Sequence, residues 1–187
     1  MSTVSKRYPQ LELEQQFCFA LYAACHAVTR VYRPLLADAE LTYPQYLTLL
    51  ALWEQPARPS TVGAIGQRLR METGTLTPIL KRLELAGYIS RDRDPADERR
   101  VLVTLTDAGL VLRDRVASVP EQLAACVGLD AAVAVRIRDE LNDLVLALER
   151  SEATGSPAPT REDQTSEEQT SEDQTSADQT SEERTSA

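Results

Sequence analysis

The chain has 187 residues, a formal net charge of −9 and a hydrophobic content of 42%. Most of the negative charge lies in residues 151–187, which hold ten acidic and two basic side chains, so residues 1–150 carry a net charge of only −1. No run approaches 18 apolar residues and no basic segment leads into an apolar one, so the sequence indicates neither a membrane span nor a secretory signal. We therefore expect a cytoplasmic protein with reduced thiols.

A long first helix is predicted from about Leu11 to Leu36. Apolar residues recur along it at alternating spacings of four and three, which is typical of a helix that packs against another. A second stripe beside the first carries a thiol or a hydroxyl at every position: Cys18, Tyr22, Cys25, Thr29 and Tyr32. Hydroxyl donors near a sulfur can stabilise its thiolate and orient an incoming peroxide, although polar residues can also simply flank a packing seam.

The spacing within this stripe limits which groups can meet. Cys18 and Tyr32 are 14 residues apart, or roughly 21 Å along a helix, so they cannot touch within one straight helix. Cys25 is the midpoint of that span, and an antiparallel two-fold pairing of first helices centred near it would bring Cys18 towards Tyr32 of the partner subunit. Cys18 and Cys25 of one helix are roughly 10 Å apart, too far for a disulfide without local unfolding.

Pro34 is expected to end or kink the first helix near Arg33. In the following segment LTYPQY, Thr42 and Gln45 have the spacing of a capping box, which places Tyr43 at the start of a second helix. This helix is mostly apolar through about Gln55 and is expected to lie in the core. The polar segment PARPS then forms a linker.

A compact DNA-reading unit is predicted from Ser60 to Thr106. A short helix over about Thr61–Leu69 precedes a second helix, capped by Thr73 and closed by Gly87, in which Leu76, Ile79, Leu80 and Leu83 form a buried face. Two strands follow, over about 88–92 and 100–105, around the turn DPADER. A helix pair followed by a charged hairpin is the pattern of a winged helix-turn-helix.

The C-terminal part is predicted to be helical and then unstructured. Thr106 caps a helix through about Val119, Pro120 interrupts it, and Cys126 falls in a short segment before a last helix that follows Asp130. From Glu162 the chain repeats five-residue units such as EDQTS, which have almost nothing apolar to bury, so we expect a disordered acidic tail over 151–187. Residues 1–150 then form one mainly α domain with a small β-hairpin wing, in which helices at about 11–36 and 107–150 build a dimerisation region.

These residues resemble the MarR family of dimeric winged-helix regulators, and specifically its organic-hydroperoxide-sensing OhrR branch. The resemblance covers most of residues 11–150. It is carried by five segments: QFCFALYAA around Cys18, VYRPLL around Tyr32, LTYPQYLTLLALWE around Tyr43, TGTLTPILKRLE in the second helix of the DNA-reading unit, and RDPADERRV in the wing.

The resemblance implies a homodimeric repressor that binds operator DNA when reduced and releases it when an organic hydroperoxide oxidises Cys18. It further implies that Tyr32 and Tyr43 of the partner subunit hydrogen-bond to this thiol, and Tyr22 is a further candidate from the same stripe. Cys126 approximately matches a resolving cysteine that some members use in an intersubunit disulfide, whereas a small cellular thiol would serve if Cys126 is out of reach. Cys25 has no role in the family pattern and is interpreted as a packing residue.

Contacts to DNA are expected from the recognition helix and the wing. Arg99 resembles the minor-groove arginine of the family, with Asp97 placed to orient it, and Arg93 is a weaker candidate. Arg91 and Arg100 are interpreted as partners of neighbouring acids rather than of DNA. The candidates in the recognition helix, for base edges or phosphates, are Thr73, Thr75, Thr77, Lys81 and Arg82.

Three other functions compete with this interpretation. A thiol peroxidase would also use two cysteines, but nothing in the chain resembles a peroxidase fold, so we do not expect an enzyme. A MarR-type regulator could instead be released by a bound small aromatic or acidic ligand, with Cys18 incidental. A metal regulator is disfavoured, since Cys25 and His26 point about 100° apart on one helix and no third ligand is near in sequence. No metal or cofactor is therefore predicted.

Overall fold

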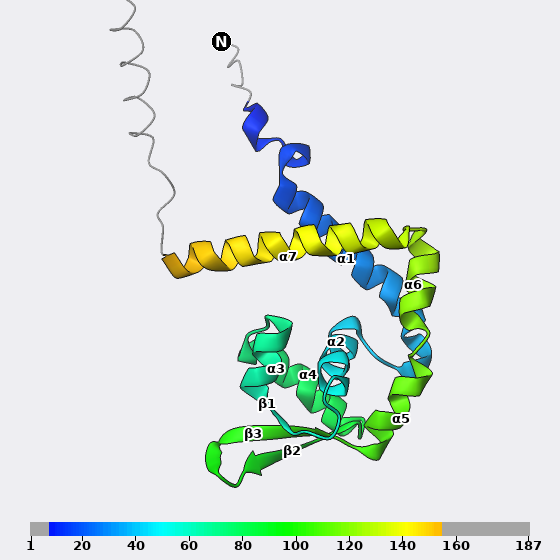
Figure 1. Cartoon of the computed structure of the whole chain (residues 1–187), viewed down its shortest axis with the longest axis vertical. Helices are drawn as coiled ribbons and strands as arrows, with labels where there is room; N and C mark the ends of the chain where they lie inside the picture. Colours follow the sequence, from blue (N-terminus) through cyan, green and yellow to red (C-terminus); the bar gives the residue numbers. More distant parts are fainter. Residues whose placement is uncertain (1–7, 155–187) are drawn as a thin grey trace, which may run out of the picture. The chain divides into compact units, whose positions relative to one another are not determined.

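The computed structural model describes residues 8–154, which fall into two compact units that divide between Leu129 and Asp130. The first unit contains six α-helices, three short 3₁₀ turns and a three-stranded sheet within its described residues (Figure 1). The second contains the helix α7 (Ala131–Thr154), capped by Asp130, whose Oδ1 accepts from the backbone N–H of Ala132 at 2.8 Å. The mainly helical winged-helix class predicted from the sequence is confirmed.

Helix α1 (Phe17–Leu35) begins six residues later than predicted. The chain before it forms two short 3₁₀ turns, Pro9–Leu11 and Leu13–Gln15, and Gln16 is in an extended conformation. The side-chain amide of Gln16 donates to the backbone oxygen of Gln10 at 2.8 Å, which stabilises the turns in place of a first helical turn. The helix includes Pro34 and ends one residue after it, close to the predicted end.

Helix α2 (Tyr43–Trp53) starts with the predicted capping box. The backbone N–H and the hydroxyl of Thr42 both donate to Oε1 of Gln45, each at 2.8 Å, so the side chain of Gln45 satisfies the backbone group that precedes the helix. At the other end the indole Nε1 of Trp53 donates to the backbone oxygen of Gly109 at 2.9 Å. Helix α2 is therefore fixed at both ends.

Helices α3 (Val62–Leu69) and α4 (Thr73–Leu85) form the helix-turn-helix. The Thr61 hydroxyl caps α3 by accepting from the backbone N–H of Ala64 at 3.1 Å. The predicted cap at Thr73 is wrong, because Thr73 is the first residue of α4 and Glu72 precedes it without a side-chain hydrogen bond. The predicted end is confirmed: Gly87 has a φ of +77°, and the N–H groups of Gly87 and Tyr88 bond back to Glu84 and Leu83.

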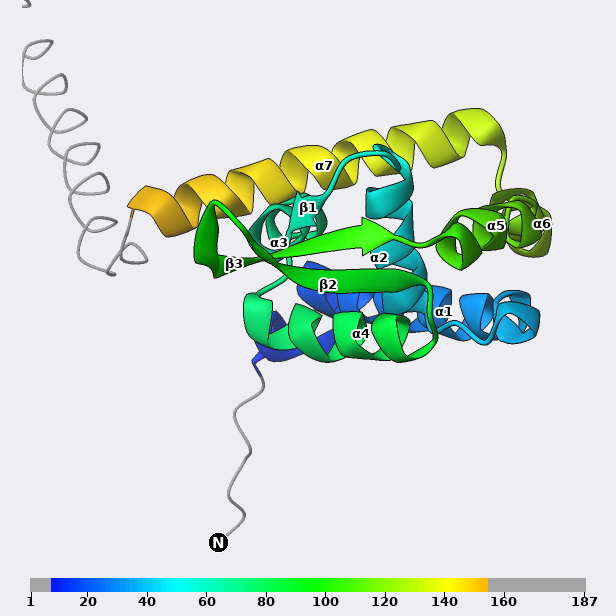
Figure 2. The same ribbon diagram turned by 90° about the horizontal axis from the view of Figure 1, so that it is seen from below.

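The sheet has the order β1-β3-β2 with antiparallel pairs (Figure 2). The strands β2 (Ile89–Asp94) and β3 (Asp97–Leu105) are longer than predicted, and only two residues separate them. The strand β1 (Ser60–Thr61) pairs with β3 and was missed, because the sequence suggested only a linker there. Helices α3 and α4 pack against β3 and β2, on the side of the sheet where α2 also lies.

Helix α5 (Asp107–Arg115) starts at the predicted cap, since the hydroxyl of Thr106 accepts from the N–H of Gly109 at 3.1 Å. Only glycine fits at position 109, because a Cβ there would lie 2.1 Å from the backbone oxygen of Tyr88. The helix ends four residues earlier than expected. Helix α6 (Val119–Val127) then has Pro120 in its first turn, so the prediction that Cys126 lies between helices is wrong: it belongs to the last turn of α6.

The buried apolar core is confined to the segment from Leu36 to Val119, and α1 and α7 contribute no buried residue to it. Helix α7 runs to Thr154, four residues into the segment predicted as tail, and the remainder of that segment lies outside the described residues. Between residues 8 and 154, no single helix is long and apolar enough to cross a membrane. Among the described residues the largest fully buried side chains are Leu36, Leu49, Leu76, Leu80, Leu83, Leu112, Val103 and Thr48.

Candidate DNA-binding surface and redox site

The recognition helix α4 presents its predicted contact residues away from the core. Thr73, Thr75, Lys81 and Arg82 are exposed and Thr77 is half-buried, whereas the side chains of the opposite face are in the core. The hydroxyl of Thr77 donates to the backbone oxygen of Thr73 at 2.7 Å, so its oxygen can still accept a hydrogen bond from outside the helix.

Two of these threonines lie beside the wing. Thr73, Thr77 and Arg99 line one surface hollow of about 390 Å³, together with the start of α3 and the strands. The wing residue Asp97 contacts Arg99 through the backbone, since its Oδ1 accepts from the Arg99 N–H at 3.1 Å. Asp97 therefore orders the backbone at Arg99 and leaves the guanidinium free to reach outward. Arg93 is also exposed, on the neighbouring strand.

Both remaining arginines of the wing have an acidic neighbour, but only that of Arg100 lies in the hairpin as the sequence suggested, whereas the acid beside Arg91 belongs to α4. Arg91 lies 3.4 Å from Glu84 of α4, and Arg100 lies 3.7 Å from Asp94. The Nε atom of Arg91 is buried and has no hydrogen-bond partner within the described part of the chain. Arg91 thus ties the wing to the recognition helix, and Arg100 is more loosely held.

Three tyrosines meet where α1 packs on α2. The rings of Tyr32 and Tyr43 are stacked with centroids 4.3 Å apart, and Tyr46 lies 5.8 Å from Tyr32. Burial, followed by the neighbouring phenols of Tyr43 and Tyr46, raises the pKa of Tyr32 to about 12. Burial likewise raises the pKa values of Tyr43 and Tyr46. All three phenols are therefore protonated hydrogen-bond donors near neutral pH.

Sequence reasoning selected Tyr32 and Tyr43 but missed Tyr46 as the third member of this cluster. The signal was the spacing of three between Tyr43 and Tyr46, which places both on one face of a helix. Within one chain, burial is the main cause of the raised pKa of Tyr43, and the charge of the Cys25 thiol group is the second. Cys25 is thus close to the phenol cluster, which the sequence did not predict.

The three cysteines Cys18, Cys25 and Cys126 are unpaired and exposed. Tyr22, which the sequence placed beside Cys18 as a hydroxyl donor, packs edge-on against His26 with centroids 4.3 Å apart and remains 62% exposed. Within residues 8–154 no three His, Cys, Asp or Glu side chains are grouped so that they could hold a metal ion. The redox candidates are therefore the exposed thiols and the phenol cluster.

Comparison with known proteins agrees with the winged helix. Residues 30–116 match the family model described as transcriptional regulator SarA/Rot. The HTH-type transcriptional regulator TtmR of Methylorubrum extorquens is 49% identical over 129 residues, which cover 69% of this chain and 65% of TtmR, slightly under two thirds of that relative.

For two further relatives the match extends over a larger part of the relative. The organic hydroperoxide resistance transcriptional regulator of Bacillus subtilis is 44% identical over 117 residues, covering 63% of this chain and 78% of that protein. The structure of reduced AbfR bound to DNA, a protein of Staphylococcus epidermidis, superposes with a TM-score of 0.62 at 34% identity, covering 74% of this chain and 96% of that one. The chain belongs to the MarR-like family of winged-helix transcriptional regulators, in the group of the SarA/Rot and organic hydroperoxide regulators.

Proposed function

We propose that this regulator is a homodimeric repressor that senses organic hydroperoxides by oxidation of Cys18 and then releases its operator. The observation that carries the proposal is the stacked pair of Tyr32 and Tyr43, two protonated phenols, of which Tyr32 lies on the same stripe of α1 as the exposed thiol of Cys18 and Tyr43 lies at the start of α2. Protonated phenols can donate to a thiolate and to the oxygen of a peroxide. The similarity to the Bacillus organic hydroperoxide regulator supports the choice of oxidant.

A second copy of the chain would complete the sensor. Cys18 and Tyr32 lie near opposite ends of α1, roughly 21 Å apart at about 1.5 Å per residue, so the thiol and phenol of one protomer do not meet. An antiparallel pairing of two α1 helices centred near Cys25 brings each Cys18 to Tyr32 of the partner subunit. Exposed apolar side chains on α1, such as Phe17 at 61% and Val28 at 37%, give a second copy a surface to cover.

The chemistry proceeds in two steps. The thiolate of Cys18 attacks the terminal oxygen of the hydroperoxide and the O–O bond breaks. The terminal OH stays on the sulfur as a sulfenic acid, and the alkoxide leaves and takes a proton from water to become an alcohol. The thiol of Cys126 of the partner subunit then condenses with this sulfenic acid, forming an S–S bond and releasing water. A small cellular thiol would give the equivalent mixed disulfide.

The disulfide would act on the DNA-binding surface through α6. Cys126 lies in the last turn of α6, which packs on α1 and is joined through α5 to the wing. A two-fold dimer reads half-sites about one helical turn apart, roughly 34–36 Å, so a shift of a few ångströms in the spacing of two α4 helices weakens both contacts together. Thr73, Thr75, Thr77, Lys81, Arg82, Arg93 and Arg99 are the proposed contacts.

The deciding experiment measures operator binding by the reduced protein with and without an organic hydroperoxide. The wild type is expected to bind and then release the operator, whereas Cys18→Ser should bind and stay bound. Cys126→Ser should still form the sulfenic acid, detectable by mass spectrometry, without the intersubunit disulfide. Cys25→Ser is the matched control and should respond like the wild type. Hydroperoxide release of both the wild type and Cys18→Ser, or of neither, would exclude Cys18 as sensor.

A further inference from the structure

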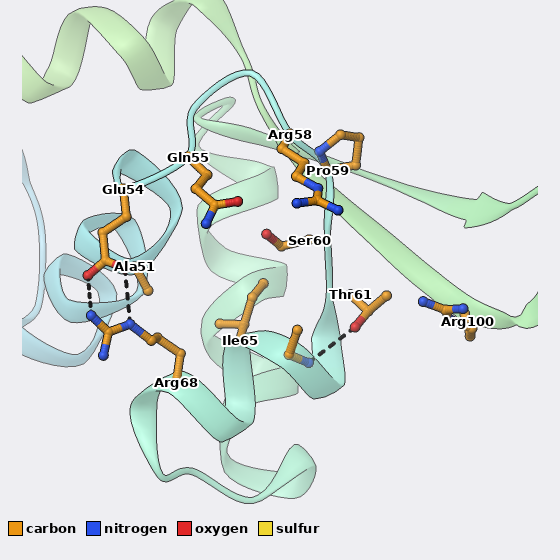
Figure 3. Close-up of a pocket in the computed structure, with 11 residues that line it drawn as sticks. Ala51, Glu54, Gln55, Arg58, Pro59, Ser60, Thr61, Ile65, Arg68 and Arg100 are labelled. Carbon is orange, nitrogen blue, oxygen red and sulfur yellow. Dashed lines mark hydrogen bonds and ion pairs between the residues drawn. The ribbon is translucent and has the colours of Figure 1, made fainter.

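Two surface hollows of the first unit share part of their lining. One, of about 350 Å³, lies where the end of α2, the linker to β1 and the outer face of α3 meet (Figure 3). The other, of about 390 Å³, is the hollow beside the wing that also contains the start of α4. Thr61 and Arg100 belong to both linings. The first hollow, named the linker hollow, therefore continues the DNA-binding surface away from the recognition helix, towards the segment that precedes β1.

Positive charge predominates in the two linings. Each contains three arginines, and Arg100 is common to both, so five arginines line this surface together with one acid, Glu54. Glu54 is bonded to Arg68 at 3.0 and 2.5 Å, so these two charges compensate each other. Arg58 in one lining and Arg99 in the other have no ion pair with any acid in the described part of the chain. Uncompensated charge is therefore present in both hollows.

The arginine that the two hollows share is only loosely held. The Nε atom of Arg100 lies 3.7 Å from an oxygen of Asp94, and the side chain of Arg100 is 55% exposed. An ion pair this open to water contributes little stability. Arg100 can therefore exchange its carboxylate partner for a phosphate at small cost, although the sequence favoured the acid as its partner.

Further hydrogen-bond donors lie between Arg58 and Arg100. In Figure 3 the guanidinium of Arg58 points towards Ser60, and Thr61 lies between Ser60 and Arg100. The oxygen of the Thr61 hydroxyl accepts from the N–H of Ala64, which leaves its own O–H able to donate outwards. Guanidinium and hydroxyl groups are among the donors that proteins direct at the phosphate oxygens of DNA.

We propose that the linker hollow holds the phosphodiester backbone of the operator, with Arg58 and Arg100 each contacting a phosphate outside the segment read by α4. The DNA backbone then runs from Arg99 and the start of α4, over Thr61, to the linker before β1. The inference rests on the DNA-binding activity of the family and on the contact proposed for Arg99. It does not rest on the oxidation of Cys18.

These contacts differ in kind from those of the recognition helix. A guanidinium on a phosphate carries no sequence information, but it fixes the position of the protein on the duplex and displaces counterions from the DNA. Arg58 and Arg100 therefore raise the affinity for any duplex and make it more sensitive to salt. The sequence did not single out Arg58, because the segment PARPS showed only the composition of a linker.

The test is fluorescence anisotropy of the full-length reduced protein with an operator duplex and an unrelated duplex of the same length, at salt concentrations between about 50 and 200 mM. Arg58→Gln should weaken binding to both duplexes by a similar factor, about tenfold. It should also lower the slope of log affinity against log salt by about 1 for each copy of the chain on the DNA. Arg100→Gln should behave in the same way. Arg58→Lys should keep most of the slope, because an ammonium also neutralises a phosphate.

The matched control is Arg113→Gln, which removes an exposed arginine of α5 outside both hollows and should leave affinity and slope unchanged. An unchanged slope in Arg58→Gln would overturn the proposal. A loss confined to the operator duplex would also overturn it, because Arg58 would then read sequence rather than phosphate. Equal losses in Arg58→Lys and Arg58→Gln, with a lowered temperature of thermal unfolding, would assign Arg58 a structural role instead.

A free anion is the competing occupant of the same donors. Isothermal titration calorimetry with inorganic phosphate, in the absence of DNA, separates the two, and we expect no saturable binding by the wild type below about 1 mM. Saturable phosphate binding that Arg58→Gln abolishes, with DNA affinity unchanged, would overturn the proposal. All measurements are made without hydroperoxide, so a failure here leaves the sensor at Cys18 untouched. A wild type that binds neither duplex would instead contradict the proposed function itself.

Discussion

The segment from Leu36 to Val119 buries apolar side chains in the core, whereas the helix α1 leaves its own at least partly exposed. The first supplies every residue of the buried core, whereas α1 has an equally regular apolar stripe and buries none of it completely. The same separation holds for α7, taken by itself, where Val135, Ile137 and Leu141 are at least 40% exposed. The winged helix is thus stabilised by the core of the segment from Leu36 to Val119, while α1 and α7, each taken by itself, leave apolar side chains exposed.

The largest expected effect separates buried from exposed leucines of the same helix. Leu80→Ala should reduce the free energy of unfolding by about 2–5 kcal/mol, because Leu80 is fully buried and its loss leaves a cavity. Leu85→Ala is the control, since Leu85 is 87% exposed, and should change stability by less than about 0.5 kcal/mol. Urea unfolding followed by circular dichroism measures both; similar losses would contradict the burial of α4.

A charge on α1 tests the other side of the comparison. Phe17→Glu should weaken dimerisation by about 2 kcal/mol or more, because a large aromatic contact is lost and a charge is desolvated. Sedimentation velocity over a range of concentrations measures the change. Leu85→Glu adds the same charge to an exposed position of α4 and should leave the dimer intact. A Phe17→Glu protein that dimerises like the wild type would show that this part of α1 is not covered by a partner.

A third change concerns the wing. Arg99→Ala should weaken operator binding by about 1–3 kcal/mol, because the guanidinium of Arg99 is expected to enter the minor groove of the DNA. The free energy of unfolding should change little. Fluorescence anisotropy at two or more salt concentrations measures the affinity and its salt dependence. Arg113→Ala removes an exposed arginine from α5 and provides the comparison. Equal affinities of the two variants would remove Arg99 from the DNA-binding surface.

The capping box before α2, inside the segment from Leu36 to Val119, gives a smaller effect. Thr42→Ala should cost about 1 kcal/mol of stability, because it removes the hydroxyl of the cap before α2. Thr75→Ala changes an exposed threonine inside α4 and should cost less. Thermal unfolding of both variants gives the difference. A larger loss for Thr75→Ala would contradict the assignment of Thr42 as a stabilising cap.

The smallest effect is an alkaline titration at Tyr32. Since burial raises the pKa of Tyr32 to about 12 from its ordinary value of 10.0, the folded protein holds this proton more tightly than the unfolded chain. The associated stability is fully present below about pH 10 and is lost as pH rises through about 12. When the absorbance of phenolate is followed against pH, the titration step at the highest pH should be absent in Tyr32→Phe. Loss of an early component instead would contradict the buried position of Tyr32.

Local hydrogen-bonding patterns in the sequence predicted several elements well. Thr42 with Gln45, Thr106, Gly87 and Asp130 all mark helix ends as their side chains or backbone preferences require, whereas Thr61 was expected only as the approximate start of α3 and proves to be its cap. The apolar spacing in α4 also identified its buried side. Such features depend on residues three or four apart, so they are visible without knowledge of the fold.

The errors arose where a longer-range contact or a proline decides the structure. The strand β1 has two residues, too few to show a period, and exists because β3 pairs with it. Pro120 was interpreted as a helix breaker, but it occupies a first turn, where the missing N–H costs nothing, and Cys126 therefore becomes helical. The proximity of Cys25 to Tyr43 depends on how α1 packs on α2, which spacing within one helix cannot reveal.

Helix α2 carries a phenol of the cluster on its first residue and the indole bonded to α5 on its last. Eleven helical residues span roughly 16 Å, so α2 sets the distance between the phenol cluster and the contacts at its other end. At its far end Trp53 donates to the backbone oxygen of Gly109 in α5, and Glu54 accepts from Arg68 in α3, so one short helix connects the phenol cluster both to α5 and to the helix-turn-helix.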